Sequence, residues 1–363
     1  MRVKCKREDF LHRIQNIQGV ISPRSTLPIL SYFLLKAKDK KISLFSTDLE
    51  VGIKCTFSGD IIDEGGITLP ARRVAELIRE FPEGEIEIFS EENITTLKSM
   101  KAKVRIHTLP PDDFPDFPEI IGKKITMEGE LLKSMLEKTI FAVSQEESKY
   151  ALNGVYIFFE DGQIEMVATD GRRLVLKEET LENQKDKQKI DCILPTKACS
   201  EIIRIINEGE VTVTWGEKQI NFSQRDVTLT SRLIEGEFPD YNAVIPKNFQ
   251  EKVIINREEL KDAVGRAYIL TKEKGSSIKI DIKNNRMMIS SKVPEVGESS
   301  EELAIKHDGG RIEIAFDPEY LLDMLKVIES EEVIMGLNSA KEAALIRPMN
   351  DEKFIYILMP IEM

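Results

Sequence analysis

The sequence is poor in the residues from which metal centres and disulfide frameworks are built. It contains four cysteines and three histidines among 363 residues. No two cysteines form a Cys-x-x-Cys motif, and no histidine lies at ligand spacing from a cysteine. We therefore expect buried, reduced thiols, and we expect no disulfide framework, no metal site and no cofactor.

Long apolar runs are also missing. No stretch approaches the roughly 20 consecutive apolar residues of a membrane-spanning helix, and the N-terminal residues contain no apolar signal region. The composition, 41% apolar and 31% charged, is typical of a globular protein. We expect a cytoplasmic protein without a membrane partner.

Net positive charge is the third absence. The formal net charge is −12, which taken alone argues against a nucleic-acid partner. The six helices expected below carry no net charge together, so the excess acid lies in strands and loops. This distribution fits a protein whose loops are merely acidic, and it also fits a relatively electropositive helical surface. Sequence-independent contact with phosphates requires only scattered Arg and Lys.

A twenty-residue pattern occurs three times, beginning at Leu69, Leu194 and Phe316. The intervals of 125 and 122 residues between these starts are close to the length of one domain. Each copy has a proline suited to the first helical turn, then apolar residues at helical spacing, then a short alternating strand. The pattern predicts helices over residues 71–80, 196–207 and 317–328.

An earlier helix precedes each copy of this pattern. Apolar residues at helical spacing predict these helices over residues 7–18, 130–142 and 257–268. Between the helices, alternating residues predict strands, and Asp161-Gly162, Asp170-Gly171 and Asn284-Asn285 indicate hairpin turns. The highly charged residues 178–189 are expected to form a mobile loop. Predicted strands cover residues 3–5, 29–37, 41–46, 51–58, 94–99, 102–108, 125–127, 154–159, 164–169, 174–177, 253–255, 278–283, 286–290 and 354–358.

The order of these elements predicts an α+β fold. Each third of the chain contains a helix with strands and then a second helix with strands, which gives three similar domains with antiparallel sheets. The predicted domains cover residues 1–121, 122–249 and 250–363.

Several short motifs, in this order along the chain, resemble the family of bacterial sliding clamps, the beta subunits of DNA polymerase III. Together with the threefold repeat, they extend the resemblance over nearly the whole sequence. They are Arg24-Ser25-Thr26-Leu27-Pro28-Ile29-Leu30, Thr47-Asp48-Leu49-Glu50, Leu69-Pro70-Ala71-Arg72, Tyr150-Ala151-Leu152-Asn153-Gly154, Ala168-Thr169-Asp170-Gly171-Arg172-Arg173-Leu174, Phe238-Pro239-Asp240-Tyr241 and Met359-Pro360.

The resemblance implies the DNA-clamp fold, with two chains joined head to tail as a homodimer and six domains forming a ring. Helices would line a channel that double-stranded DNA threads regardless of its sequence. The implied function is that of a processivity factor, which hydrolyses nothing itself. The implied partners are the alpha subunit of the replicative polymerase, an ATP-driven clamp loader, and other proteins that carry clamp-binding motifs.

The resemblance also implies which basic residues contact DNA. Three of them stand at expected helix starts, where positive charge opposes the helix dipole, so a role other than helix stability is favoured. The implied DNA-binding residues are Arg24, Arg72, Arg73, Lys149 and Lys197.

A second implied site is an apolar groove that binds short peptides from partner proteins. Pro360 cannot extend the last strand because it has no N–H, so the terminal residues are expected to lie across a neighbouring surface. The sequence departs from the family at Ala243 and at Ile361-Glu362, which leaves the peptide preference open. The implied groove residues are Leu152, Thr169, Gly171, Arg172, Arg173, Leu174, Pro239, Val244, Met359, Pro360 and Ile361.

The implied dimer interface combines an edge strand of the first domain with two apolar residues of the third. It places Val104 and Ile106 of one chain against Ile269 and Leu270 of the other. An exposed apolar edge strand is an aggregation hazard unless it is covered.

Two other functions compete with this interpretation. A metal-dependent nuclease could use Asp48 and Asp170, but these residues lie on separate repeats without a second carboxylate or a histidine at ligand spacing. An interaction scaffold that binds no DNA is the other alternative.

Overall fold

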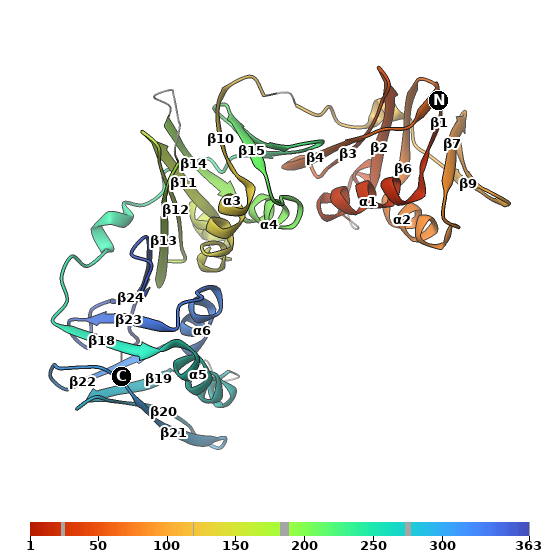
Figure 1. The fold of residues 1–363 in the computed structure, drawn as a ribbon. Helices are drawn as coiled ribbons and strands as arrows, with labels where there is room; N and C mark the ends of the chain where they lie inside the picture. Colours follow the sequence, from red (N-terminus) through yellow and green to blue (C-terminus); the bar gives the residue numbers. More distant parts are fainter. Residues whose placement is uncertain (23–25, 119, 182–188, 273–276, 363) are drawn as a thin grey trace. The chain divides into compact units, whose positions relative to one another are not determined.

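The protein is described by a computed structural model that covers residues 1–22, 26–118, 120–181, 189–272 and 277–362 (Figure 1). Its contacts define two compact units. The first unit contains Met1–Lys133 and Lys197–Leu233, and the second contains Ser134–Thr196 and Ile234–Met363. The predicted segments 1–121, 122–249 and 250–363 are called the first, middle and last repeat.

Each described repeat begins with a strand and an α-helix, continues with four or five strands and a second α-helix, and ends with three strands. The first repeat contains β1 (Arg2–Lys6), α1 (Arg7–Ile17), η1 (Gln18–Val20), η2 (Pro28–Ser31), β2 (Tyr32–Lys38), β3 (Lys41–Thr47), β4 (Val51–Phe57), β5 (Asp60–Asp63), β6 (Gly65–Pro70), α2 (Ala71–Glu80), β7 (Glu85–Glu91), β8 (Ile94–Ser99), β9 (Ala102–His107) and η3 (Pro111–Asp113).

The middle repeat contains β10 (Lys123–Glu128), α3 (Gly129–Glu137), η4 (Ile140–Ala142), η5 (Glu147–Leu152), β11 (Gly154–Glu160), β12 (Gln163–Thr169), β13 (Arg173–Thr180), β14 (Lys189–Pro195), α4 (Thr196–Ile205), β15 (Glu210–Trp215), β16 (Gln219–Gln224), β17 (Val227–Arg232) and η6 (Tyr241–Val244). The last repeat contains β18 (Glu251–Asn256), α5 (Arg257–Thr271), β19 (Ile278–Lys283), β20 (Arg286–Val293), β21 (Gly297–Ala304), β22 (Ile312–Phe316), α6 (Pro318–Val327), β23 (Glu332–Leu337), β24 (Ala344–Pro348) and β25 (Phe354–Leu358).

Two eight-stranded antiparallel sheets each combine strands from consecutive repeats. In the first unit, β17 of the middle repeat pairs with β4 of the first, where Leu229 lies opposite Ile53. In the second unit, β13 of the middle repeat pairs with β25 of the last, where Leu174 lies opposite Ile357. The compact units therefore divide the middle repeat, because each of these sheets continues from one repeat into the next.

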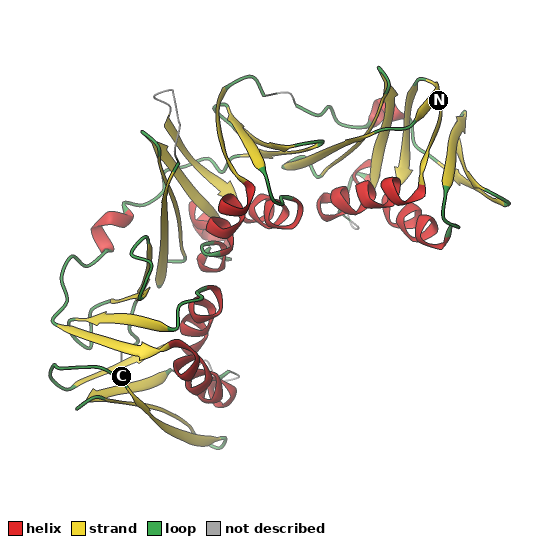
Figure 2. Cartoon of the chain, viewed as in Figure 1, coloured by secondary structure: helices red, strands yellow, loops and turns green. Residues whose placement is uncertain are grey.

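Two smaller sheets are formed by strands of the first repeat alone and of the last repeat alone. The first unit has a five-stranded sheet in the order β5-β1-β7-β8-β9, and the second has a four-stranded sheet in the order β21-β20-β19-β22. Strands β9 and β21 are edge strands, so one side of each backbone remains available for pairing. Figure 2 shows that α1 lies beside α2 and α5 beside α6 within these repeats.

One backbone hydrogen bond is repeated three times. The first N–H of the leading helix donates to the loop after the second helix, with Arg7 N to Gly84 O at 2.8 Å, Gly129 N to Gly209 O at 2.8 Å, and Arg257 N to Glu331 O at 2.9 Å. The three repeats therefore share the same arrangement of two helices and antiparallel strands, which confirms the predicted α+β fold of three similar domains with antiparallel sheets.

The C-terminal carbonyls of the second helix are satisfied in two ways. Arg7 Nη1 donates to Ile78 O at 3.2 Å and Arg257 Nη1 donates to Leu325 O at 3.0 Å. Gly129 occupies this position in the middle repeat, and there Asn207 Nδ2 donates to Ile205 O at 3.1 Å. The unpaired carbonyls that end any helix thus receive a side-chain donor in every repeat.

Helix lengths depart from the prediction in the middle repeat. The helix predicted over 130–142 ends at Glu137, because Thr139 Oγ1 donates back to Met135 O at 2.9 Å and the chain continues as η4. The helix predicted over 196–207 ends at Ile205. The predicted strand 29–37 begins only at Tyr32, because Pro28 opens the short helix η2.

The prediction of a mobile loop over residues 178–189 was wrong at both ends. Glu178, Glu179 and Thr180 belong to β13, where they pair with β12, and Lys189 pairs with Glu160 as the first residue of β14. Residues 182–188 lie outside the described part of the chain. Charge alone did not indicate that the strand continues, because the Glu179 carboxylate is balanced by ion pairs with Lys177 and Lys353.

Candidate functional site

A hollow of about 180 Å³ opens in the second unit, at the pairing of β13 with β25. All of the groove residues predicted from the sequence line this hollow except Pro360 and Ile361. Phe238, Asp240, Tyr241 and Ile357 also line it, and they were not among the predicted groove residues. The full lining is Leu152, Thr169, Gly171, Arg172, Arg173, Leu174, Phe238, Pro239, Asp240, Tyr241, Val244, Ile357 and Met359.

Apolar side chains form the inner wall of the hollow. Leu174 is 4% exposed and packs in a cluster with Val167, Leu176, Leu345 and Ile357. The alternation of β13 places Leu174 and Leu176 on the same face. The wall is therefore part of a continuous sheet, in which Leu174 lies opposite Ile357.

The turn from Thr169 to Leu174 forms one rim of the hollow. Asp170 Oδ1 accepts the N–H groups of Arg172 and Arg173 at 2.8 and 3.0 Å, and Thr169 Oγ1 accepts Gly171 N at 3.0 Å. Gly171 has φ +91°, a left-handed conformation that favours glycine. The sequence therefore specifies a rigid turn that leaves the rim open above Leu174.

Three residues, Tyr156, Phe238 and Tyr241, form an aromatic shelf at one side of the hollow, which Phe238 and Tyr241 line. The rings of Tyr156 and Phe238 are stacked at 4.9 Å, and the Tyr241 hydroxyl bonds the Glu165 carboxylate. Burial, and then Glu165, raise the pKa of Tyr241, so its hydroxyl remains a neutral donor. The sequence did contain a signal for this shelf, because Phe238-Pro239-Asp240-Tyr241 had been singled out as a motif.

The C-terminal residues are held beside the turn. Met359 N donates to Arg172 O at 2.9 Å, and Ile361 N donates to Ala315 O in β22 at 2.8 Å. Met359 lines the hollow, whereas Ile361, which is 38% exposed, does not. The expectation that the terminal residues lie across a neighbouring surface is confirmed for Met359 and Ile361.

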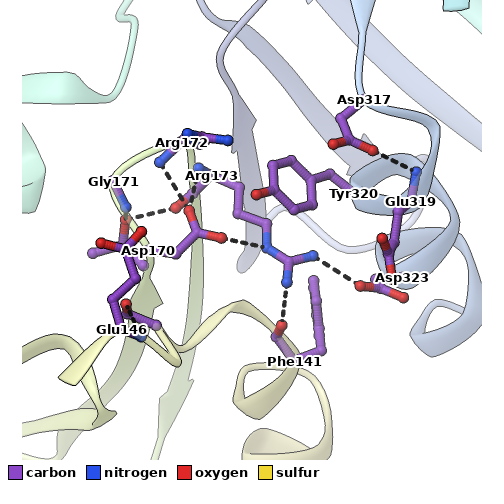
Figure 3. A network of polar contacts seen from close by, with 12 residues as sticks. Phe141, Glu146, Asp170, Gly171, Arg172, Arg173, Asp317, Glu319, Tyr320 and Asp323 are labelled. Carbon is purple, nitrogen blue, oxygen red and sulfur yellow. Dashed lines mark hydrogen bonds and ion pairs between the residues drawn. The ribbon is translucent and has the colours of Figure 1, made fainter. Parts of the chain in front are cut away.

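Figure 3 shows where the two arginines of the turn point. The guanidinium of Arg173 lies among Phe141, Tyr320 and Asp323, and the side chain is buried. Arg172 is exposed. Arg173 therefore contributes its backbone and stem to the hollow, while Arg172 is the cation available at the rim.

Known proteins resemble this chain along its whole length. The models for the N-terminal, central and C-terminal domains of the DNA polymerase III beta subunit match residues 1–118, 126–240 and 242–362. The beta sliding clamp of Pseudomonas aeruginosa is 33% identical over all of both chains. The chain belongs to the DNA polymerase III beta subunit family.

Solved structures of this family share the fold. The sliding clamp of Bacillus subtilis superposes with a TM-score of 0.97 at 29% identity, covering 100% of this chain and 99% of that one. The DNA polymerase III beta subunit of Pseudomonas aeruginosa gives 0.97 at 32% identity and full coverage of both chains. A sliding clamp from the same organism bound to griselimycin gives 0.95 at 32% identity, again with full coverage of both.

The basic residues that the beta subunit resemblance assigned to DNA differ in their surroundings. Arg24 lies outside the described residues. Arg72 and Arg73 are exposed at the start of α2, and Arg72 Nε bonds Glu76 Oε1 at 3.1 Å. The Lys197 ammonium pairs with the Asp48 carboxylate, and Lys149 Nζ donates to Asp170 O at 3.1 Å. Among the described candidates, Arg73 has no ion-pair partner.

The residues assigned to the dimer interface lie at accessible positions. Val104 and Ile106 are half-buried on the edge strand β9, between the exposed side chains of Lys103, Arg105 and His107. Ile269, on α5, is 75% exposed, and Leu270 beside it is half-buried. Both pairs of residues are therefore accessible in the single chain.

The two aspartates of the nuclease alternative are structural in both repeats. Asp48 Oδ1 accepts Glu50 N at 2.9 Å and Val51 N at 2.7 Å, which repeats the arrangement at Asp170. Within the described residues, no group of three His, Cys, Asp or Glu is arranged to hold a metal ion. No helix in the same residues is long and apolar enough to cross a membrane.

Proposed function

We propose that this chain is the sliding clamp of a bacterial replicative DNA polymerase, a non-catalytic processivity factor. Two copies form a head-to-tail ring that encircles duplex DNA and tethers the polymerase through the hollow at β13. The observation that carries the proposal is this apolar hollow, formed at the pairing of β13 and β25 in a chain of the beta subunit family.

The proposed domains are residues 1–121, 122–249 and 250–363. The threefold hydrogen bond between the leading helix and the loop after the second helix supports this division. The ranges of the three matching domain models support it as well. The two eight-stranded sheets then join neighbouring domains, so the boundaries are linkers in the sequence but not breaks in the sheets.

The hollow binds short peptides that carry bulky apolar anchors. Its wall is apolar, and its few polar groups at the turn can orient a peptide backbone. Each buried Leu or Phe anchor contributes roughly 1.5–3 kcal/mol, which gives exchangeable binding. The polymerase alpha subunit, the clamp loader and other proteins with clamp-binding motifs would therefore take turns at one site.

The dimer is proposed to join β9 of one copy to the last repeat of the other. Strand β9 carries Lys103 and Arg105, whereas the edge strand β21 carries Glu298, Glu301 and Glu302. Opposite charges on the two edge strands favour the pairing of β9 with β21, and they disfavour the pairing of two β9 strands or of two β21 strands. A protein of this kind acts in the bacterial cytoplasm, where its DNA is.

Calorimetry with a synthetic Gln-Leu-Ala-Leu-Phe peptide tests the groove. We expect one site per chain and competition by griselimycin, which is bound in the structure of a relative. A peptide with both leucines and the phenylalanine replaced by serine is the matched control and should not bind. Equal heats for the two peptides would contradict an apolar groove.

A further inference from the structure

Arg173 connects three parts of the second unit that are distant in sequence. Its Nε donates to Asp170 Oδ2 at 3.1 Å in the turn, its Nη2 to Phe141 O at 2.6 Å in η4, and its Nη1 to Asp323 Oδ2 at 2.9 Å in α6 (Figure 3). The residue is 9% exposed. A buried cation must be paired to be tolerated. Here each of the three guanidinium nitrogens donates to an acceptor.

Two aromatic rings enclose the same guanidinium. The centroid of Tyr320 lies 4.3 Å from Cζ of Arg173, and that of Phe141 lies 5.5 Å away. Tyr320 is fixed in turn, because its carbonyl accepts the Tyr356 hydroxyl at 2.9 Å. A planar guanidinium suits this enclosure, whereas the point charge of lysine has neither the fork nor the flat face.

The far end of this network does not touch the hollow. Asp323 belongs to α6, and its other oxygen, Oδ1, accepts Lys326 Nζ at 3.2 Å. Asp317 caps the start of α6 by accepting Glu319 N at 2.9 Å, so the helix begins at a fixed point. The turn that forms the groove rim is thereby tied to a helix of the last repeat through one buried cation.

At the groove, Arg173 and its neighbour Arg172 are connected to three features of the hollow. Arg173 holds the Asp170 carboxylate that organises the turn, it directly precedes Leu174 on the wall, and Arg172 O receives the N–H of Met359. A displacement of Arg173 would move the rim, the wall and the C-terminal contact together.

We propose that Arg173 is a positioning residue of the peptide groove, and that peptide affinity depends on Asp323, which lies outside the groove. The inference rests on the proposed function, because it assumes that the hollow binds peptides. It adds that α6 and the groove share an anchor, so a change in the position of α6 alters peptide binding.

The test measures the Kd of the Gln-Leu-Ala-Leu-Phe peptide by calorimetry on the full chain. Asp323→Asn keeps the shape of the side chain but removes its charge, and Arg173→Lys keeps the charge but removes the fork. Each is expected to weaken binding on the order of tenfold. Lys326→Ala is the matched control, since it removes the other partner of Asp323 and should leave the Kd unchanged.

The double variant distinguishes positioning from general stability. If Arg173 and Asp323 act through their contact, the losses of affinity in Arg173→Lys with Asp323→Asn are clearly less than additive. Asp323→Glu, which retains the charge, should recover part of the affinity and covers the case in which Asp323→Asn does not fold. A lowered melting temperature with unchanged Kd, or additive losses, would overturn the inference. Failure of the unsubstituted chain to bind the peptide would instead overturn the proposed groove, and the inference with it.

Discussion

Leu174 links the sheet of the second unit to its proposed ligand. It is 4% exposed, pairs with Ile357 and lines the hollow. We expect Leu174→Ala to raise the Kd of the peptide about tenfold, or about 1.4 kcal/mol, because part of the apolar wall is lost. Leu345→Ala is the matched control, since Leu345 belongs to the same buried cluster but does not line the hollow. Calorimetry showing equal losses in both variants would contradict a direct role for Leu174.

Leu49 occupies the position in the first repeat that Gly171 occupies in the middle one. Its φ is +81°, and its side chain is 44% exposed. A leucine in the left-handed region is strained, by about 1–2 kcal/mol, and exposed Leu49 gains little from packing. We expect Leu49→Gly to raise the free energy of unfolding by about 0.5–1 kcal/mol, since glycine adopts this conformation without strain but is less ordered in the unfolded chain. A lowered free energy in urea titration would show that Leu49 makes a stabilising contact.

At the scale of the elements, the helices were the most predictable. The helix over 71–80 was predicted with its observed bounds, because the spacing of its apolar residues is regular and Pro70 marks its start. Strands such as β16 and β17 were not predicted. Strand β16 pairs with its neighbours β15 and β17 in the sequence, but β17 also pairs with β4 of the first repeat, and no local pattern records such a distant pairing.

The groove was partly predictable, because some of its residues belong to local sequence motifs and others are placed only by tertiary packing. The Thr-Asp turn and Leu174 are local signals, and their assignment to a groove came through the resemblance. The positions of Ile357 and Tyr241 depend on tertiary packing. The dimer and DNA residues remain predictions, since a single chain brings neither partner to them.

The linker after the first repeat covers the position that corresponds to the groove wall. The position of Leu174 is taken there by Gly52, and a side chain at Gly52 would meet the ring of Phe117 at 3.0 Å. Phe117 packs against Phe45 with ring centroids 5.6 Å apart. The same turn therefore supports a groove in one repeat and a covered aromatic pair in the other.

The C-terminal segment after β25 contributes a wall residue to the hollow and can be removed without shortening a strand. Met359 lines the hollow, whereas β25 ends at Leu358 and stays intact when Met359–Met363 are deleted. We expect this deletion to abolish peptide binding in calorimetry, because the wall loses Met359 and its contact with Arg172. The deleted chain should keep its dimer mass and its retention on DNA. Unchanged peptide affinity would contradict the placement of the groove.

For the whole molecule, assembly depends on surfaces that the single chain leaves uncovered. We expect Ile269→Asp combined with Leu270→Asp to yield monomers of 41.4 kDa in place of dimers, since two buried carboxylates would oppose an apolar interface. Ile121→Asp is the control, because Ile121 is 98% exposed and lies in the linker. Solution scattering measures the mass, and a dimer in both variants would contradict the assigned interface.

Contacts with DNA should be electrostatic and independent of sequence. The affinity decreases with salt, and the magnitude of the slope of log affinity against log salt should become smaller by about 0.9 for each phosphate contact removed. We expect Arg73→Ala to reduce the magnitude of this slope. Glu83 is a loop residue without a basic group, and Glu83→Ala should leave the slope unchanged. Binding measured at several salt concentrations on two unrelated sequences tests both points, and a preference for one sequence would argue against a sliding contact.

We propose that the dimer encircles DNA, and the topology of the DNA decides whether it does. After loading by a clamp loader and ATP, the protein should co-elute with nicked circular DNA in gel filtration. Cutting the same DNA once with a restriction enzyme should release it, because a ring slides off a free end. Equal retention on circular and linear DNA would contradict encirclement and indicate ordinary surface binding.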